Sequence, residues 1–144
     1  MWASSMALNG LTGSGKVGAW SCHPMEHELS AHYDITHGVG LAILTPSWMR
    51  YILKDETVDK FVDYAMNVWN LPYNEDKFAL ANEAIDATEN FFKECGIPMT
   101  LREVGIDDSK FKEMAEAAVN HGNLQYAYVS LNKEDVYKIF SMCL

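Results

Sequence analysis

Residues 77–94, KFALANEAIDATENFFKE, carry a clear helical pattern. Their apolar side chains recur every three or four residues, which places them along one face of an α-helix. The members of this stripe are Leu80, Ala84, Ile85, Thr88, Phe91 and Phe92. Gly96 is placed to end the helix in a left-handed conformation, and Pro98 blocks any continuation. The segment therefore predicts one amphipathic helix with a defined end.

Helical spacing recurs on both sides of this segment. Residues 58–69 repeat it with charged side chains on the opposite face, and their stripe is Val58, Phe61, Val62, Ala65, Val68 and Trp69. Residues 38–53 are almost free of charge, which predicts a buried helix. Residues 2–8 form a short apolar helix, and the last helix buries Val136, Ile139 and Phe140. Tyr126–Leu131 is the only possible strand. We therefore predict an all-α fold, a multi-helix bundle forming one domain over residues 1–144.

Capping residues locate several helix ends. Thr100 and Glu103 match a capping box that opens one short turn, which Gly105 closes. Asp107 or Asp108 is expected to cap a helix that runs through Met114 and Val119 and stops at Gly122. Asn132 is expected to cap the last helix.

Composition narrows the class of protein. The 144 residues carry a formal net charge of −9, with no basic stripe to neutralise a run of phosphates, so we expect no nucleic-acid partner. No apolar run has the length of a membrane span, and the N-terminus lacks the features of a signal peptide. The three cysteines are widely spaced and do not form a CxxC motif. We therefore expect a cytoplasmic protein without a membrane segment.

Two catalytic motifs are matched only in part. Gly10–Lys16 (GLTGSGK) has the glycines and lysine of a phosphate-binding loop, but Val17 stands where a hydroxyl residue must hold magnesium, and the preceding segment predicts helix instead of strand. His27–His32 (HELSAH) resembles the zinc-protease helix, but its histidines are five apart. That spacing separates them by about 140° around a helix. His32 is therefore expected to be a surface or packing residue.

Three other histidines form a better candidate site. His23 and His27 are four residues apart and can share a helix face, with Pro24 suited to the first turn of that helix. His37 begins the next helix, beside Gly38. Imidazole suits iron, zinc or copper, and a carboxylate such as Glu26, Glu28 or Asp34 commonly completes such a shell. This cluster predicts a metal site.

Residues 21–50, SCHPMEHELSAHYDITHGVGLAILTPSWMR, resemble the metal-binding signature of the iron-containing (group III) alcohol dehydrogenases, closest to the butanol dehydrogenase branch. MWASSMALNGL (1–11), IPMTLREVGI (97–106) and YVSLNKEDVYKIF (128–140) share the family's character. The resemblance implies a helical metal domain that follows a separate NAD(P)-binding domain. It also implies interconversion of a primary alcohol and an aldehyde, with the metal acting as a Lewis acid on the substrate oxygen.

The resemblance assigns roles to the three histidines. His23 and His37 are expected to be ligands of Fe2+, or alternatively Zn2+, and His27 to lie in the substrate and nicotinamide pocket as the catalytic side chain. The family's other two ligands, an Asp and a His, have no counterpart, because residues 1–20 contain neither residue type. We therefore expect the C-terminal part of the helical domain, inactive without an N-terminal partner chain and prone to form homo-oligomers. The alternative is a non-catalytic helical remnant or interaction module that exposes Trp2, Met6 and Leu8.

Overall fold

The protein is described here by a computed structural model covering residues 1–15 and 18–144. That part of the chain contains seven α-helices and two short 3-10 helices. They are α1 (Trp2–Leu8), α2 (Cys22–Tyr33), α3 (His37–Ile52), α4 (Val58–Val68), α5 (Lys77–Glu94), η1 (Arg102–Val104), α6 (Phe111–Gly122), η2 (Leu124–Tyr126) and α7 (Lys133–Met142). The predicted all-α class is confirmed. The possible strand at Tyr126–Leu131 is wrong, because Tyr126 lies in η2 and Ala127 makes only an isolated bridge with Ala19.

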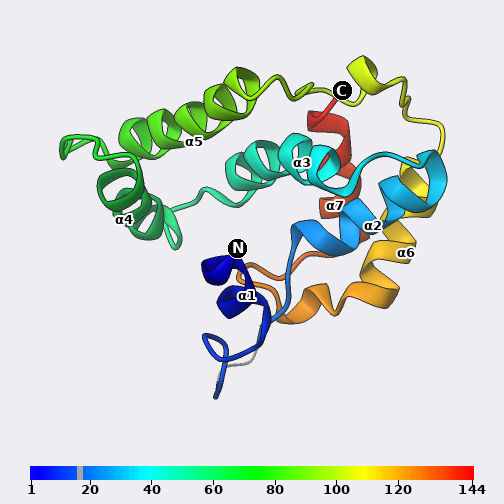
Figure 1. Ribbon diagram of the computed structural model, residues 1–144, viewed down its shortest axis with the longest axis horizontal. Coiled ribbons are helices and arrows are strands. Elements are labelled where there is room, and N and C mark those ends of the chain that lie inside the picture. Colours follow the sequence, from blue (N-terminus) through cyan, green and yellow to red (C-terminus); the bar gives the residue numbers. More distant parts are fainter. Residues whose placement is uncertain (16–17) are drawn as a thin grey trace.

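Helix α3 lies at the centre of the arrangement. It packs against α2, α5 and α7, while α2 also packs against α6, and α6 against α7. Figure 1 shows α3 and α5 running alongside each other, with α4 at one end and α2, α6 and α7 at the other. The two helices that carry the histidine cluster, α2 and α3, are therefore packed on each other and supported from behind by α6 and α7.

The core follows most of the predicted apolar stripes. Val136, Ile139 and Phe140 of α7 are fully buried, as predicted. Two predicted core residues are instead exposed, Phe91 at 49% and Val68 at 56%. Phe91 lies in the last turn of α5, past the end of α4, and rests edge-on against Trp69 with the ring centroids 6.2 Å apart. Val68 is the last residue of α4, and it is the next residue, Trp69, that hydrogen-bonds to Thr88 of α5.

Three of the predicted helix ends have the expected chemistry. Gly96 has φ +77° after α5. Glu103 accepts hydrogen bonds from the Met99 and Thr100 amides, both at 2.9 Å, and its own amide donates to the Thr100 hydroxyl at 3.2 Å. Asn132 caps α7 in a full capping box with Asp135.

The predicted start of α6 is wrong. The helix begins at Phe111 and has no side-chain cap. Asp107 instead accepts hydrogen bonds from the amide and hydroxyl of Ser109, at 3.0 and 2.5 Å, and so closes a local turn before the helix starts. Aspartate caps helices and turns by the same hydrogen bond, so its presence alone does not decide between them.

The end of α6 lies where predicted, but Gly122 serves a different purpose. Asn123, with φ +53°, supplies the left-handed residue. Gly122 faces the first turn of α2, where a Cβ atom on it would come within 2.4 Å of the Pro24 Cβ. Glycine at this position therefore lets α6 approach α2 closely.

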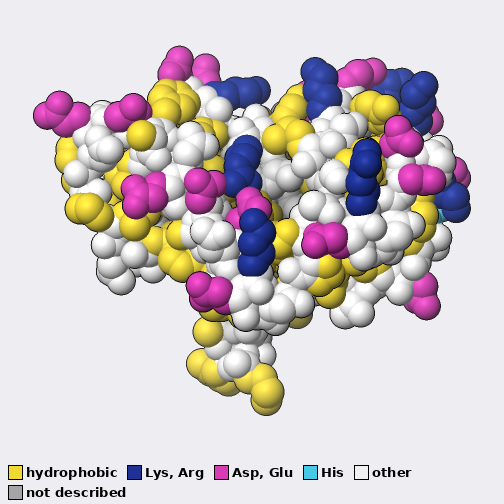
Figure 2. Space-filling model, turned by 90° about the horizontal axis from the view of Figure 1, so that it is seen from above, with side chains coloured by type: hydrophobic (Ala, Val, Ile, Leu, Met, Phe, Trp, Pro, Cys, Tyr) yellow, Lys and Arg dark blue, Asp and Glu magenta, His cyan; other side chains and the backbone are white. Residues whose placement is uncertain are grey.

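Helix α1 stands apart from this core. It has no buried residue, and Trp2 and Leu8 are 80% and 68% exposed as expected, whereas Met6 is partly buried. Figure 2 shows hydrophobic side chains gathered on a projecting part of the molecule, while acidic and basic side chains alternate over the rest of that face. Among the described residues, no helix is both long enough and apolar enough to cross a membrane.

An ion-pair network joins α3 to α5 and predicts a pH effect. Lys93 donates to Glu89 at 2.6 Å, and Arg50 donates to Glu89 at 2.9 Å and to Asp86 at 2.6 Å. The Lys93 hydrogen bond is the main cause that holds the pKa of Glu89 below its ordinary 4.5; burial opposes it and Arg50 adds to it. Since the folded state binds this proton less tightly than the unfolded state, the stabilisation is present above about pH 4.5 and is lost as the pH falls through the lower folded-state pKa.

We expect Glu89→Gln to lower the free energy of unfolding by about 0.5 kcal/mol at neutral pH, because Glu89 is partly exposed and solvent screens the pair. The difference from wild type should shrink below pH 4.5. Urea unfolding of both proteins at neutral and acidic pH measures it. Parallel pH profiles would show that this network does not contribute.

Candidate metal centre

The site is built where the start of α2 meets the start of α3. His23 lies in the first turn of α2, beside Pro24, whose missing N–H costs nothing there. His27 follows one turn later on the same helix. Asp34, with φ +52°, ends α2 in a left-handed turn, and His37 is the first residue of α3. The turn between the helices thus folds His37 back onto α2.

The three histidines converge as the sequence predicts. Their ring centroids are 5.3 Å apart for His23 and His37, 5.5 Å for His27 and His37, and 6.3 Å for His23 and His27. Trp20 stands edge-on to His23 with its ring centroid 4.2 Å away. A groove of about 560 Å³ opens in front of them, with Leu8, Trp20, His23, His27, His121 and Gly122 among its lining residues. A ligand can therefore reach the His23 and His27 imidazoles from solvent through this groove, whereas His37 stands beside it without lining it.

Electrostatics favour uncharged imidazole at this site. The pKa of His23 is lowered, first by burial and then by the neighbouring His37 and His27, while Glu26 acts in the opposite direction. A neutral imidazole keeps a lone pair available for a metal ion. The His23 imidazole is thus favoured as an electron-pair donor.

A buried carboxyl group lies directly behind the histidines. Glu26 is fully buried, and its Oε2 is in hydrogen-bond contact with Nδ1 of His37. Its Oε1 accepts one from the Ser30 hydroxyl at 2.5 Å. One oxygen of Glu26, one nitrogen of His27 and one nitrogen of His37 all lie within 4.8 Å of one another. The sequence placed Glu26 beside the cluster but gave no sign of its contact with His37, which is made only when the two helices cross.

The other candidate residues lie outside this cluster. His32 faces away, with Nε2 3.9 Å from Glu28 and Nδ1 3.3 Å from the Lys110 ammonium. Its role as a packing residue agrees with the five-residue spacing. The glycine-rich loop follows helix α1, where a phosphate-binding loop needs a strand. Lys16 and Val17, which that motif also involves, lie outside the described residues. His121, which the sequence did not single out, lines the groove beside the cluster.

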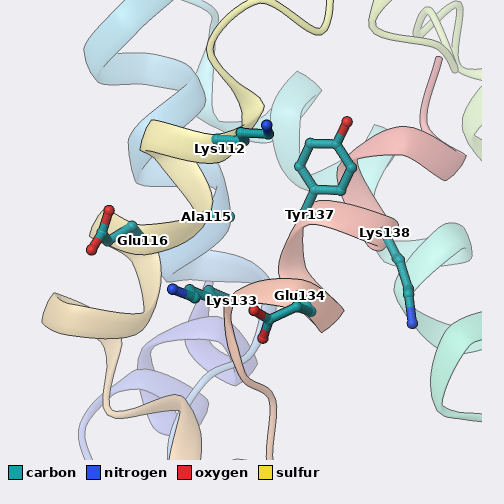
Figure 3. A pocket seen from close by; sticks show the side chains of 7 residues that line it. All are labelled: Lys112, Ala115, Glu116, Lys133, Glu134, Tyr137 and Lys138. Carbon is teal, nitrogen blue, oxygen red and sulfur yellow. The ribbon is translucent and has the colours of Figure 1, made fainter.

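A second groove, of about 500 Å³, lies between α6 and α7. Figure 3 shows its lining side chains, among which Glu116 and Lys138 point away from each other on opposite sides. It is lined by Lys112, Ala115, Glu116, Lys133, Glu134, Tyr137 and Lys138. This set contains no histidine, cysteine or buried carboxyl group, so the groove offers no metal-binding chemistry comparable with that of the histidine cluster.

Comparison with known proteins identifies the family. Residues 1–144 match the family model described as "Fe-containing alcohol dehydrogenase family, C-terminal". The chain belongs to the iron-containing alcohol dehydrogenase family. Its fold agrees with that family's solved structures, which confirms the resemblance inferred from residues 21–50.

Several members of this family are close in sequence and structure. The NADH-dependent butanol dehydrogenase A of Clostridium acetobutylicum is 57% identical over 141 residues, covering 97% of this chain and 36% of the relative. The crystal structure of the Thermotoga maritima NADH-dependent butanol dehydrogenase A is 31% identical, with a TM-score of 0.84 over 99% of this chain and 37% of that one. That of Escherichia coli YqhD is also 31% identical, with a TM-score of 0.88 over 100% of this chain and 37% of that one. The chain thus spans little more than a third of the length of these iron-containing alcohol dehydrogenases.

Proposed function

We propose that residues 1–144 form the metal-binding helical domain of an NAD(P)-dependent alcohol dehydrogenase that interconverts a small primary alcohol and its aldehyde. His23 and His37 are the metal ligands in this proposal, and His27 is the catalytic side chain. The observation that carries it is the convergence of the three imidazole rings beside an open groove that His23 and His27 line. The names of the related butanol dehydrogenases support the substrate class.

The donor atoms of this site fit a divalent metal. Imidazole nitrogen is a common ligand for Fe2+ and Zn2+, and the lowered pKa of His23 keeps its lone pair free. Glu26 fits the same interpretation, since a buried carboxyl group that contacts a ligand histidine is a frequent feature of metal sites. We propose Fe2+, with Zn2+ as the alternative. Two imidazoles leave the coordination shell open, so further ligands are needed for tight binding.

In the reaction, the bound metal and nicotinamide supply a positive charge at the substrate oxygen and a hydride carrier, respectively. His23, which lines the groove, and His37, whose ring is 5.3 Å from it, would hold the metal. His27 is exposed on the groove side of α2, beside His37, where it can donate a hydrogen bond to the substrate oxygen or pass a proton to solvent. The groove walls, including Trp20, limit the size of the substrate.

We further propose that the remaining ligands and the nucleotide-binding site come from outside residues 1–144, in a partner chain or a further part of the same protein, and that the assembly is a homo-oligomer. The second candidate function is a non-catalytic interaction module, which the exposed Trp2 and Leu8 of α1 favour. The two candidates differ in one property, since only the first requires the histidines to bind metal.

Metal titration of the purified chain tests the first candidate. We expect Zn2+ or Co2+ to bind with near 1:1 stoichiometry, and His23→Ala and His37→Ala each to weaken binding by about 10-fold or more, because each removes one donor of an already open shell. Isothermal titration calorimetry measures the affinity. His32→Ala is the matched control, because it removes an imidazole from the same helix outside the cluster and should leave binding unchanged. Absence of binding, or equal losses in all three variants, would instead favour the interaction module.

A further inference from the structure

The buried Glu26 side chain has a hydrogen-bond partner for each oxygen. Burying a carboxyl group without hydrogen-bond partners strongly destabilises the folded protein, so the partners of a buried carboxyl group show what keeps it in place. The side chain is fully buried, with Oε1 2.5 Å from the Ser30 hydroxyl and Oε2 on Nδ1 of His37. The Ser30 hydroxyl also lies 3.0 Å from the Ile35 carbonyl in the turn before α3, and its single proton serves the nearer acceptor, Glu26. Glu26 therefore sits in a fixed position between the two helices.

The facing helix is shaped to admit this side chain. A Cβ atom on Gly40 would lie 2.7 Å from Cγ and 2.9 Å from Oε1 of Glu26. These distances are shorter than van der Waals contact, so α3 can cross α2 here only because residue 40 has no side chain. Ser30 and Gly40 thus leave a fitted space between α2 and α3 for the Glu26 carboxyl group. The only ring that this carboxyl group is described as contacting is that of His37.

We propose that Glu26 is the positioning residue of the metal centre: it accepts the Nδ1 proton of His37 and so directs Nε2 of that ring, with its lone pair, toward the space shared with His23 and His27. A neutral imidazole carries one proton, and a carboxylate that accepts from Nδ1 places that proton there. In metalloproteins such a partner fixes the tautomer and orientation of the ligand ring. This inference deepens the proposed function and rests on it for the identity of His37 as a ligand.

Direct coordination by Glu26 is the competing interpretation, because its oxygen lies within 4.8 Å of the donor atoms of His27 and His37. The contacts favour positioning. Both oxygens are already engaged, and the Glu26 side chain has no exposed surface, whereas the His37 side chain is 48% exposed. A ligand must turn a free lone pair toward an open space, and the half-exposed His37 ring beside His23 and His27 can do so.

The tautomer of His37 in the metal-free 144-residue chain tests the inference. We expect nitrogen-15 NMR of the imidazole at a pH where His37 is neutral to show the proton on Nδ1 in the wild type. Glu26→Gln keeps an acceptor oxygen and should keep that tautomer. Glu26→Ala removes it and should shift His37 toward the Nε2-protonated form. Glu83→Ala, which removes an exposed carboxylate from α5, is the control for lost charge and should leave the tautomer unchanged.

Co2+ affinity supplies the second readout. With positioning, Glu26→Ala should weaken binding about 10-fold or more and Glu26→Gln much less. Equal losses in the two variants, with the His37 tautomer unchanged in Glu26→Gln, would make Glu26 a ligand and overturn the inference. An unchanged tautomer in Glu26→Ala would overturn it as well. If the wild type binds no Co2+, the proposed function fails, and the NMR result separately decides whether Glu26 controls His37.

Discussion

Gly40→Ala is expected to lower the free energy of unfolding by about 2 kcal/mol and to weaken metal binding together with it. The added methyl group would overlap Cγ and Oε1 of Glu26, at 2.7 and 2.9 Å. Overpacking of this kind costs about 1–3 kcal/mol, and moving Glu26 away from Ser30 and His37 leaves a buried polar group unpaired at a similar cost. The greater helix propensity of alanine offsets about 1 kcal/mol of this destabilisation.

Two further variants show whether this contact is the cause. Gly38→Ala is made in the same helix, where a Cβ atom would meet no other atom within 4 Å, and is expected to be neutral or slightly stabilising. Adding Gly40→Ala to Glu26→Ala should cost less than Gly40→Ala costs alone, because the overlapped atoms are gone. Urea unfolding followed by circular dichroism measures the wild type and all four variants, including Glu26→Ala alone. If Gly40→Ala were as stable as Gly38→Ala, the prediction that α2 and α3 need a glycine at residue 40 to pack this closely would be wrong.

Local sequence chemistry predicts most of the helices and two kinds of helix end. The apolar stripe of residues 136–140 and the capping box at Asn132 depend only on neighbours within one or two helical turns, so both can be predicted from the sequence alone. Phe91 differs because its burial depends on how far the partner helix α4 extends, and Val68 differs because the neighbouring Trp69 makes the contact with α5 instead. Asp107 differs because a turn and a helix compete for the same side-chain hydrogen bond.

In the candidate site, too, the features that depend on neighbours in the sequence could be predicted, and those that depend on helix packing could not. His23, His27 and His37 could be grouped from the sequence because they are close along the chain and flank one turn. The Glu26–His37 contact and the space beside Gly40 could not, since both arise from the angle and distance at which α2 and α3 cross. Among the described residues, the group whose donor atoms lie close enough to hold a metal ion consists of Glu26, His27 and His37. Asp34 and Glu28, two other acidic residues beside the cluster, lie outside it, and so does His23. Sequence spacing alone therefore narrows the carboxylates to a few, and helix packing selects among them.

Gly122→Ala is expected to lower the free energy of unfolding by about 2 kcal/mol, although glycine at a helix end suggests only a terminator. A Cβ atom there would lie 2.4 Å from Cβ and 2.6 Å from Cγ of Pro24. The proline ring is rigid and cannot rotate away, so α6 must move back from the first turn of α2. Because His23 is the residue before Pro24, metal affinity should fall with stability. Comparison of urea unfolding curves and of Zn2+ affinity measures both effects.

The neighbouring Asn123 separates close packing from helix termination. It carries the left-handed conformation, with φ +53°, that ends α6. Asn123→Gly should therefore be neutral or stabilise by up to about 1 kcal/mol, since glycine adopts this conformation freely. If termination were the purpose of Gly122, its replacement would lengthen α6 without disturbing Pro24, and metal affinity would not change. A loss of both stability and affinity in Gly122→Ala, with neither lost in Asn123→Gly, instead places the requirement at the α2–α6 contact, where Pro24 and Gly122 line the same groove as His23 and His27.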